Sequence, residues 1–147
     1  MIWAHGMIEK GEQTLETKGF HVIIDAFNCK SSILDDAKEL EKQLDLTAER
    51  LEMIVLNRSF HKFEPYGVTG TLILSTSHMS IHTWPEKNYA AIDIYTCGKK
   101  NPLQEVQNIL QYLSAEYAVV YDVSRGAEYM AKQSVRIIRN EKTSHKP

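Results

Sequence analysis

Short apolar runs alternate with turn signals along most of the chain, and this pattern predicts a β-sheet. The run FHVIIDAF over residues 20–27 is rich in β-branched and aromatic residues and is typical of a strand. The PYG triplet that begins at Pro65 has turn chemistry, and Pro85 should end the strand before it. Further strands are expected at residues 52–63, 68–75, 78–84, 89–97 and 117–123.

Two other segments repeat their apolar residues at helical spacing. In the first segment, Ser31 or Ser32 can cap a helix. In the second, Asn101 is a good N-cap and Pro102 suits the first helical position. The apolar positions are Ile33, Ala37, Leu40 and Leu44 in the first helix, and Leu103, Val106, Leu110 and Leu113 in the second. Both amphipathic helices should pack their apolar stripes on the sheet.

The expected order of elements is strand, helix, four strands, helix, strand. Successive strands indicate antiparallel pairing with both helices on one face. The predicted fold class is therefore α+β, a two-layer sandwich of a mainly antiparallel sheet and two helices. The other face of the sheet carries many apolar residues and has no helix to cover it. A homodimer is one way to bury that face.

Composition is consistent with one globular domain. The chain has 147 residues, of which 43% are hydrophobic, and a formal net charge of −2. We expect an N-terminal extension over 1–18, a domain over 19–136 and a loose, charged tail over 137–147. The charge balance gives no basic surplus for a nucleic-acid partner, and no apolar run reaches membrane-spanning length. No signal-peptide pattern is found at the N-terminus, so the cytoplasm is the default compartment.

The stretch from His61 to Gly98 carries the clearest motifs, HKF, PYGV, SHMSIHTWPE and YAAIDIYTCG. In this order and spacing they resemble the processing and active-site region of the prokaryotic, pyruvoyl-dependent S-adenosylmethionine decarboxylases, which are made as proenzymes. The strong resemblance covers roughly a quarter of the chain. The remainder agrees in its order of elements, including the FHVIIDAFNC segment.

The resemblance implies that the chain cleaves itself between Thr76 and Ser77. Ser77 would attack the preceding carbonyl, the resulting ester would break by β-elimination, and the serine remnant would become a pyruvoyl group. His82 matches the histidine that assists this processing, and Thr69 occupies the position of a supporting serine. The pyruvoyl group would form a Schiff base with the substrate amine, so neither pyridoxal phosphate nor a metal is expected.

The resemblance also assigns the decarboxylation step. Cys97 matches the proton donor, Phe63 matches an aromatic contact to adenine, and Glu86 matches an acid that binds the ribose hydroxyls. The substrate would be S-adenosylmethionine, and the product would be the decarboxylated aminopropyl donor for spermidine synthesis. The family resemblance further implies a homodimer of cleaved protomers.

Two departures from the family pattern leave alternatives open. Thr76 stands where glutamate is common, and Lys87 and Asn88 stand where Tyr-Gly is usual. One alternative is a pyruvoyl-dependent decarboxylase of a basic amino acid, ornithine or arginine. Another is an uncleaved, inactive paralogue with a regulatory binding role.

Strand parity imposes a geometric condition on the proposed roles. In an ideal strand over 78–84, His78 and His82 share one face, whereas Ser77 has the opposite parity. Ser77 and His82 can act at one centre only if a turn or bulge lies near residues 76–78. His61 and His78 are interpreted as packing or surface residues.

Overall fold

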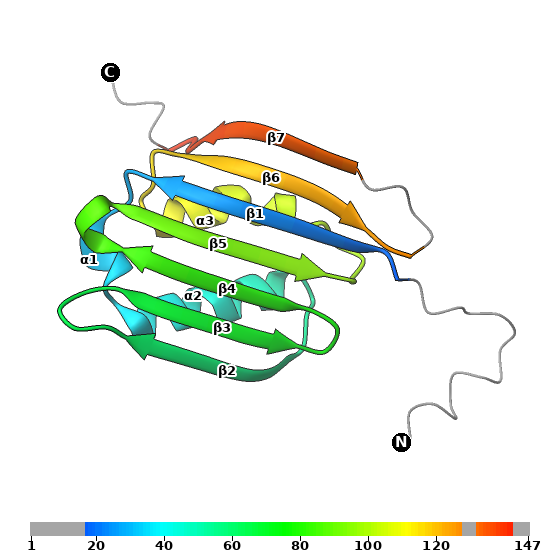
Figure 1. Ribbon diagram of the computed structural model, residues 1–147, viewed down its shortest axis with the longest axis horizontal. Coiled ribbons are helices and arrows are strands. Elements are labelled where there is room, and N and C mark those ends of the chain that lie inside the picture. The colour runs from blue at the N-terminus through cyan, green and yellow to red at the C-terminus, as the bar shows by residue number, and fades with distance from the viewer. Residues whose placement is uncertain (1–16, 128–131, 143–147) are drawn as a thin grey trace, which may run out of the picture.

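One seven-stranded antiparallel sheet forms the whole front layer of the protein, and the helices lie behind it (Figure 1). The computed structural model describes residues 17–127 and 132–142. The strands are β1 (Gly19–Phe27), β2 (Val55–Lys62), β3 (Val68–Leu74), β4 (His78–Trp84), β5 (Tyr89–Thr96), β6 (Tyr117–Arg125) and β7 (Lys132–Arg139). Their spatial order is β2-β3-β4-β5-β1-β6-β7. The predicted α+β class with a mainly antiparallel sheet is confirmed.

The second layer consists of helices packed on one face of the sheet. They are α1 (Ser31–Leu34), α2 (Ala37–Arg50) and α3 (Val106–Tyr112), with the short 3-10 turns η1 (Pro85–Lys87) and η2 (Pro102–Glu105). The predicted first helix is broken in two, because the Asp36 side chain caps a new helix by accepting a hydrogen bond from the backbone N–H of Glu39 at 3.0 Å. The predicted cap at Asn101 is confirmed, since its side chain accepts from the backbone N–H of Leu103. Among the described residues, no helix is long and apolar enough to cross a membrane.

Side-chain alternation along the strands separates a core face from an open face. Val22 and Ile24 of β1, Met79 and Ile81 of β4, and Ile94 of β5 are buried towards the helices. The open face instead carries polar side chains at its centre and exposed apolar side chains near its edges. These exposed apolar residues include Ile73 of β3 and Val135 and Ile137 of β7.

The sequence prediction missed β7 and therefore ended the domain too early. This strand pairs with β6 from Tyr117↔Arg139 to Ser124↔Lys132, so it crosses the boundary predicted at residue 136. Asn140 is also buried, and its amide donates to the carbonyl oxygens of Leu110 and Ala115. Residues 137–140 are thus part of the folded unit, not a loose tail. The extension predicted over 1–18 lies almost wholly outside the described residues.

Candidate active site

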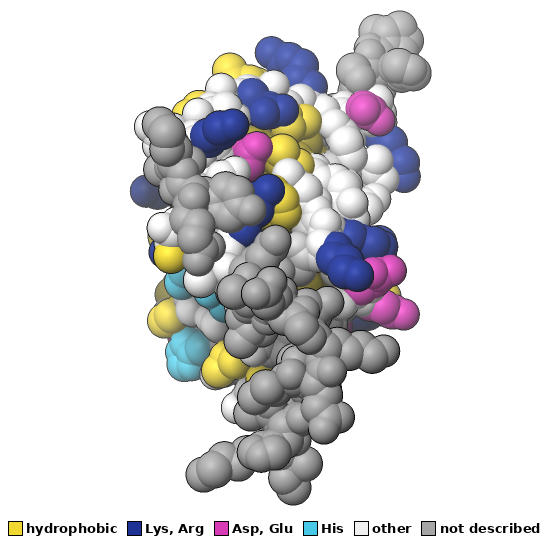
Figure 2. All heavy atoms as spheres, turned by 90° about the vertical axis from the view of Figure 1, so that its right-hand side faces the viewer, with side chains coloured by type: hydrophobic (Ala, Val, Ile, Leu, Met, Phe, Trp, Pro, Cys, Tyr) yellow, Lys and Arg dark blue, Asp and Glu magenta, His cyan; other side chains and the backbone are white. Residues whose placement is uncertain are grey.

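Ser77 closes the tight turn between β3 and β4. The backbone N–H of Leu74 donates to the carbonyl of Ser77 at 3.0 Å, and the N–H of Ser77 donates back to Leu74 at 3.5 Å. This turn lies at the right-hand end of the sheet in Figure 1. Figure 2 looks onto that end, and histidine side chains gather along one edge of the view. The scissile peptide predicted between Thr76 and Ser77 is therefore held in a short, hydrogen-bonded turn.

Cys97 lies directly beside Ser77. Its backbone N–H donates to the Ser77 Oγ at 3.2 Å, because the pairing of His78 with Tyr95 brings the end of β5 next to the start of β4. The Cys97 thiol in turn donates to the Tyr95 hydroxyl at 3.6 Å. The structure thus brings together two of the predicted site residues that are twenty positions apart in the sequence.

The other cysteine has a different environment. Cys29 is buried, and this burial raises the pKa of its thiol to about 12. A thiol in such surroundings stays protonated and unreactive at neutral pH. Cys97 is only half-buried, so it is the more accessible of the two thiols.

A second group of predicted residues gathers at the opposite end of β4. Thr69 and His82 are paired across β3 and β4, and the Thr69 Oγ1 lies 3.0 Å from the His82 Nδ1. Both residues line a cavity of about 390 Å³ that also contains Phe63 and Glu86. Tyr66, Gly67, Thr83 and Trp84 complete its lining. Four of the predicted residues therefore share one concave site.

These two groups do not form one centre within a single chain. Strand β4 pairs with β5 without a register shift from His78 to Trp84, so it contains no bulge. At about 3.3 Å per residue, His82 lies roughly 13 Å along the strand from His78. The turn at Ser77 is present, but it does not bring His82 any nearer. The turn that strand parity requires near residues 76–78 is thus present, but Ser77 and His82 do not meet inside one protomer.

The loop that carries Phe63 is anchored to the junction between α1 and α2. An Asp35 carboxylate oxygen accepts from the backbone N–H of Gly67 at 2.8 Å and pairs with the Lys62 ammonium group at 2.8 Å. These bonds, the one from Lys62 above all, hold the pKa of Asp35 below its ordinary value. The backbone N–H of Phe63 also donates to the Gly67 carbonyl. The break between the two helices thus supplies the acid that positions this wall of the cavity.

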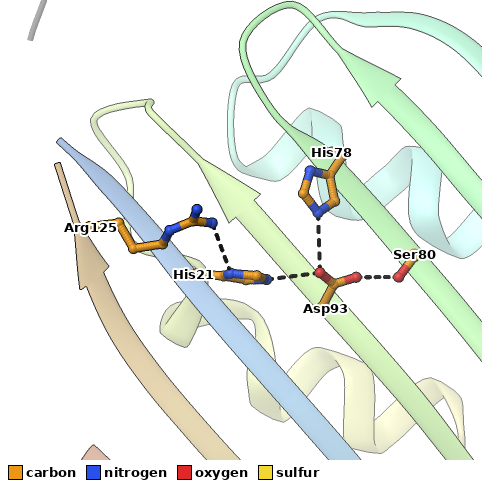
Figure 3. Close-up of polar contacts among 5 residues, drawn as sticks. All are labelled: His21, His78, Ser80, Asp93 and Arg125. Atoms are coloured by element: carbon orange, nitrogen blue, oxygen red, sulfur yellow. Dashed lines mark hydrogen bonds and ion pairs between the residues drawn. The ribbon is translucent and has the colours of Figure 1, made fainter. Parts of the chain in front are cut away.

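A hydrogen-bonded network occupies the centre of the open face, between the two ends of β4 (Figure 3). Asp93 is its hub, and its Oδ2 lies 2.8 Å from the His21 Nε2 and 3.1 Å from the His78 Nε2. Ser80 donates to the other carboxylate oxygen, and Arg125 reaches the His21 Nδ1 at 3.4 Å. The sequence interpretation of His78 as a packing or surface residue overlooked this network.

The network favours the ionised form of Asp93. Burial alone would raise the pKa of this carboxyl, but the hydrogen bonds from Ser80, His21 and His78 outweigh it and hold the pKa below its ordinary value. Cross-strand register explains the assembly, since His21, His78 and Asp93 come from three neighbouring strands and share one face. That register links positions up to 72 residues apart, so spacing along the sequence gives no direct signal for it.

The same three residues also have the composition of a metal site. One ligand atom from each of His21, His78 and Asp93 lies within 4.8 Å of the others. However, an arginine can only donate, so the contact of Arg125 with the His21 Nδ1 makes that nitrogen an acceptor and places the imidazole proton on Nε2. A protonated Nε2 cannot ligate a metal. The geometry therefore favours a hydrogen-bonded network over a metal centre.

Comparison with known proteins places the chain in a clear context. Residues 20–126 match the S-adenosylmethionine decarboxylase family. The chain is 43% identical over 115 residues to a protein of Pyrococcus abyssi named S-adenosylmethionine decarboxylase proenzyme, an alignment that covers 78% of this chain and 83% of that one. A protein of the same name from Thermococcus kodakarensis is 44% identical over 116 residues, covering 78% and 80%.

Solved structures agree on the fold. The crystal structure of the adenosylmethionine decarboxylase from Aquifex aeolicus superimposes with a TM-score of 0.63 and 24% sequence identity, covering 82% of this chain and 90% of that one. At this identity the likeness concerns the fold alone.

Proposed function

The chain belongs to the S-adenosylmethionine decarboxylase family, and we propose that it is a self-cleaving proenzyme that decarboxylates S-adenosylmethionine with a pyruvoyl group made from Ser77. The observation that carries this proposal is the meeting of Ser77 with Cys97 at the end of the sheet. The backbone N–H of Cys97 donates to the Ser77 Oγ there, and the peptide before Ser77, the one that would be cut, lies in a tight turn.

The chain's own residues can be assigned to the cleavage. The Ser77 hydroxyl belongs to the residue directly after the Thr76 carbonyl, so proximity would supply much of the acceleration. The N–H of Cys97 fixes the orientation of the Ser77 Oγ. Thr69 and His82, already hydrogen-bonded to each other, would provide a hydroxyl donor and a base.

The pyruvoyl group fits the residues around Ser77. Once formed, it supplies an electron sink for the charge that decarboxylation leaves on the substrate. The carbon that loses carbon dioxide then requires a proton, and the thiol of Cys97, whose backbone N–H contacts the Ser77 Oγ, would donate it. Phe63 offers an aromatic face to adenine, and Glu86 offers a carboxylate to the ribose hydroxyls.

We further propose that a second copy of the chain completes the site. The hydrogen-bonded Thr69 and His82 lie far from the Ser77 end of β4. Ser77 and Cys97, in turn, lie far from the His82 end. Two open faces related by a two-fold axis would place the Ser77 end of one copy against the His82 end of the other. Such a pairing would also cover the exposed Ile73, Val135 and Ile137.

One departure from the family pattern has a structural explanation. Asn88 adopts a left-handed backbone with φ of 52°, which asparagine tolerates better than most residues and glycine tolerates freely. Its side-chain amide donates to the Cys29 carbonyl, so it has a local structural role. Lys87 lies outside the cavity that contains Phe63 and Glu86. Neither residue favours a basic amino acid as substrate.

The test combines mass with turnover. We expect the purified protein, denatured, to give two fragments that separate between Thr76 and Ser77, the second lacking its amino group. The Ser77→Ala variant should stay full length. Only the cleaved protein should release labelled carbon dioxide from carboxyl-labelled S-adenosylmethionine. It should release none from carboxyl-labelled ornithine or arginine. A full-length mass for both proteins would overturn self-cleavage and favour the inactive paralogue.

A further inference from the structure

Tyr95 joins the central network to the Cys97 thiol. It stands two residues before Cys97 at the end of β5, so both side chains lie on the open face. The Tyr95 hydroxyl is the acceptor of the Cys97 S–H at 3.6 Å. The intervening residue, Thr96, is buried on the opposite face. Tyr95 is thus the side chain through which the network touches the proposed proton donor.

The ring of Tyr95 is enclosed on several sides. His21 contacts it edge-on with ring centres 5.5 Å apart, and His78 contacts it at 5.7 Å. The Arg125 guanidinium lies over its face at 4.7 Å, a cation–π distance. On another side is Gly19, where an added Cβ would lie only 2.6 to 2.8 Å from the ring and its hydroxyl. A ring enclosed in this way holds its hydroxyl at a fixed place.

Asp93 in turn fixes the side chains that enclose the ring. Both His21 and His78 bond to its Oδ2, and Arg125 is held by His21. The hydrogen bond from Cys97 and burial together raise the pKa of Tyr95 above its ordinary value. The phenol is therefore neutral at physiological pH and keeps its hydroxyl as a partner for the thiol.

We propose that Tyr95 is a positioning residue for Cys97, and that the network of Asp93, His21, His78 and Arg125 serves to hold the Tyr95 hydroxyl in place. A thiol on a free side chain rotates among three staggered positions. The bond to Tyr95 selects one of them. The functional part of this proposal rests on the proposed role of Cys97 as proton donor, whereas its structural part does not.

The first experiment measures the thiol directly and needs no pyruvoyl group. In the uncleaved Ser77→Ala protein, the infrared S–H stretching band of Cys97 can be isolated by subtracting the spectrum of the same protein with Cys97→Ala. A hydrogen-bonded thiol absorbs at lower wavenumber than a free one. We expect Tyr95→Phe, which keeps the ring and removes the hydroxyl, to move this band to higher wavenumber.

Tyr89→Phe is the matched control. Tyr89 lies on the same strand and face, and its hydroxyl donates to Asp25 at 2.6 Å, away from Cys97. This substitution should leave the Cys97 band in place. Gly19→Ala is a second, independent variant, because its new methyl group would displace the Tyr95 ring, and it should move the band as Tyr95→Phe does. An unchanged band in both Tyr95→Phe and Gly19→Ala would overturn the proposal.

The second experiment tests the functional part in the cleavable protein. We expect Tyr95→Phe to lower kcat by about five- to tenfold, the effect of about one hydrogen bond, with KM unchanged. In heavy water, the wild type should place deuterium on one face of the product carbon, and the variant should lose that selectivity. An unchanged kcat and full selectivity would refute the role in catalysis. Absence of turnover in the wild type would refute the proposed function, while the infrared result would still decide the contact.

Discussion

The two ends of strand β4 carry two different groups of the residues that we propose for one chemistry. At its start, the backbone N–H of Cys97 donates to the Ser77 Oγ, next to the central network. At its far end, the Thr69–His82 pair lies beside a cavity with an aromatic side chain and a carboxylate. The first end has a hydroxyl that could act as the nucleophile, and a thiol. The second has a binding cavity but nothing to be cleaved.

In the proposed dimer, this difference would account for an open face that the described helices leave uncovered. A protomer that kept both halves at one end would need no partner. In the proposed dimer, a second open face would bring together the two groups that the regular strand β4 keeps apart. The polar centre and the apolar edges of the open face would then belong to one interface.

The largest expected effect comes from blocking that interface. Ile23 lies half-buried on the open face of strand β1, opposite Asp93 of β5, the central strand. We expect Ile23→Glu to give a folded monomer that is not cleaved at all, because a desolvated charge opposes pairing of the faces. Sedimentation velocity and denatured mass check both results. Leu46→Glu, on the outer side of α2, should remain dimeric and cleaved. A cleaved Ile23→Glu monomer would show that one chain can cleave itself without a second copy.

A smaller effect is expected from the anchor of the binding cavity. Asp35→Ala removes the acceptor for the Gly67 N–H and the Lys62 ammonium group, and so loosens the loop that carries Phe63. We expect KM to rise about five- to tenfold, with cleavage complete and kcat little changed. Asp36→Ala, which removes the neighbouring α2 cap instead, should lower stability and leave KM unchanged. Equal KM values for both variants would show that the anchor has no part in binding.

The smallest effect concerns the pH dependence of stability. The folded-state pKa of Asp93 is lowered, so its contribution to stability is fully present above the ordinary aspartate pKa of about 3.9 and is lost as pH falls through the folded value. Wild-type protein should therefore lose stability more steeply below about pH 4 than Asp93→Asn. Urea unfolding at fixed protein concentration from neutral to acid pH measures this slope. If the free energy of unfolding fell with pH in the same way for both proteins, Asp93 would not be ionised in the network.

Much of the fold could be predicted because its central strands alternate cleanly. The predictions for 68–75, 78–84 and 89–97 match β3, β4 and β5 to within one residue. Strand β7 was missed because KQSVRIIR alternates charges with apolar side chains that remain exposed, so it has the composition of a tail. The break between α1 and α2 was missed because the apolar spacing continues across it, whereas the Asp36 cap decides the outcome.

The candidate site was predictable only where a motif covers it. The motifs gave both halves of the site residue by residue, but they could not show that the halves lie apart. That result depends on β4 being free of bulges, which only the pairing register shows. The network around Asp93 carries no motif, and it depends on three strands meeting in one register. The same holds for Tyr95. Its spacing of two residues from Cys97 can be read from the sequence, but its contacts with side chains of other strands cannot.

The most direct test of a site shared between two copies is complementation between Ser77→Ala and His82→Ala. Each variant alone should stay uncleaved, since a positioned base is worth about 10²–10⁴-fold in rate. When the two are co-expressed with different tags, a mixed dimer contains one site with both defects and one site with neither. We predict that the His82→Ala chain is cleaved in that dimer and that activity returns at half the wild-type sites. If both chains remain intact in a purified mixed dimer, the two halves act within one chain and the central claim is wrong.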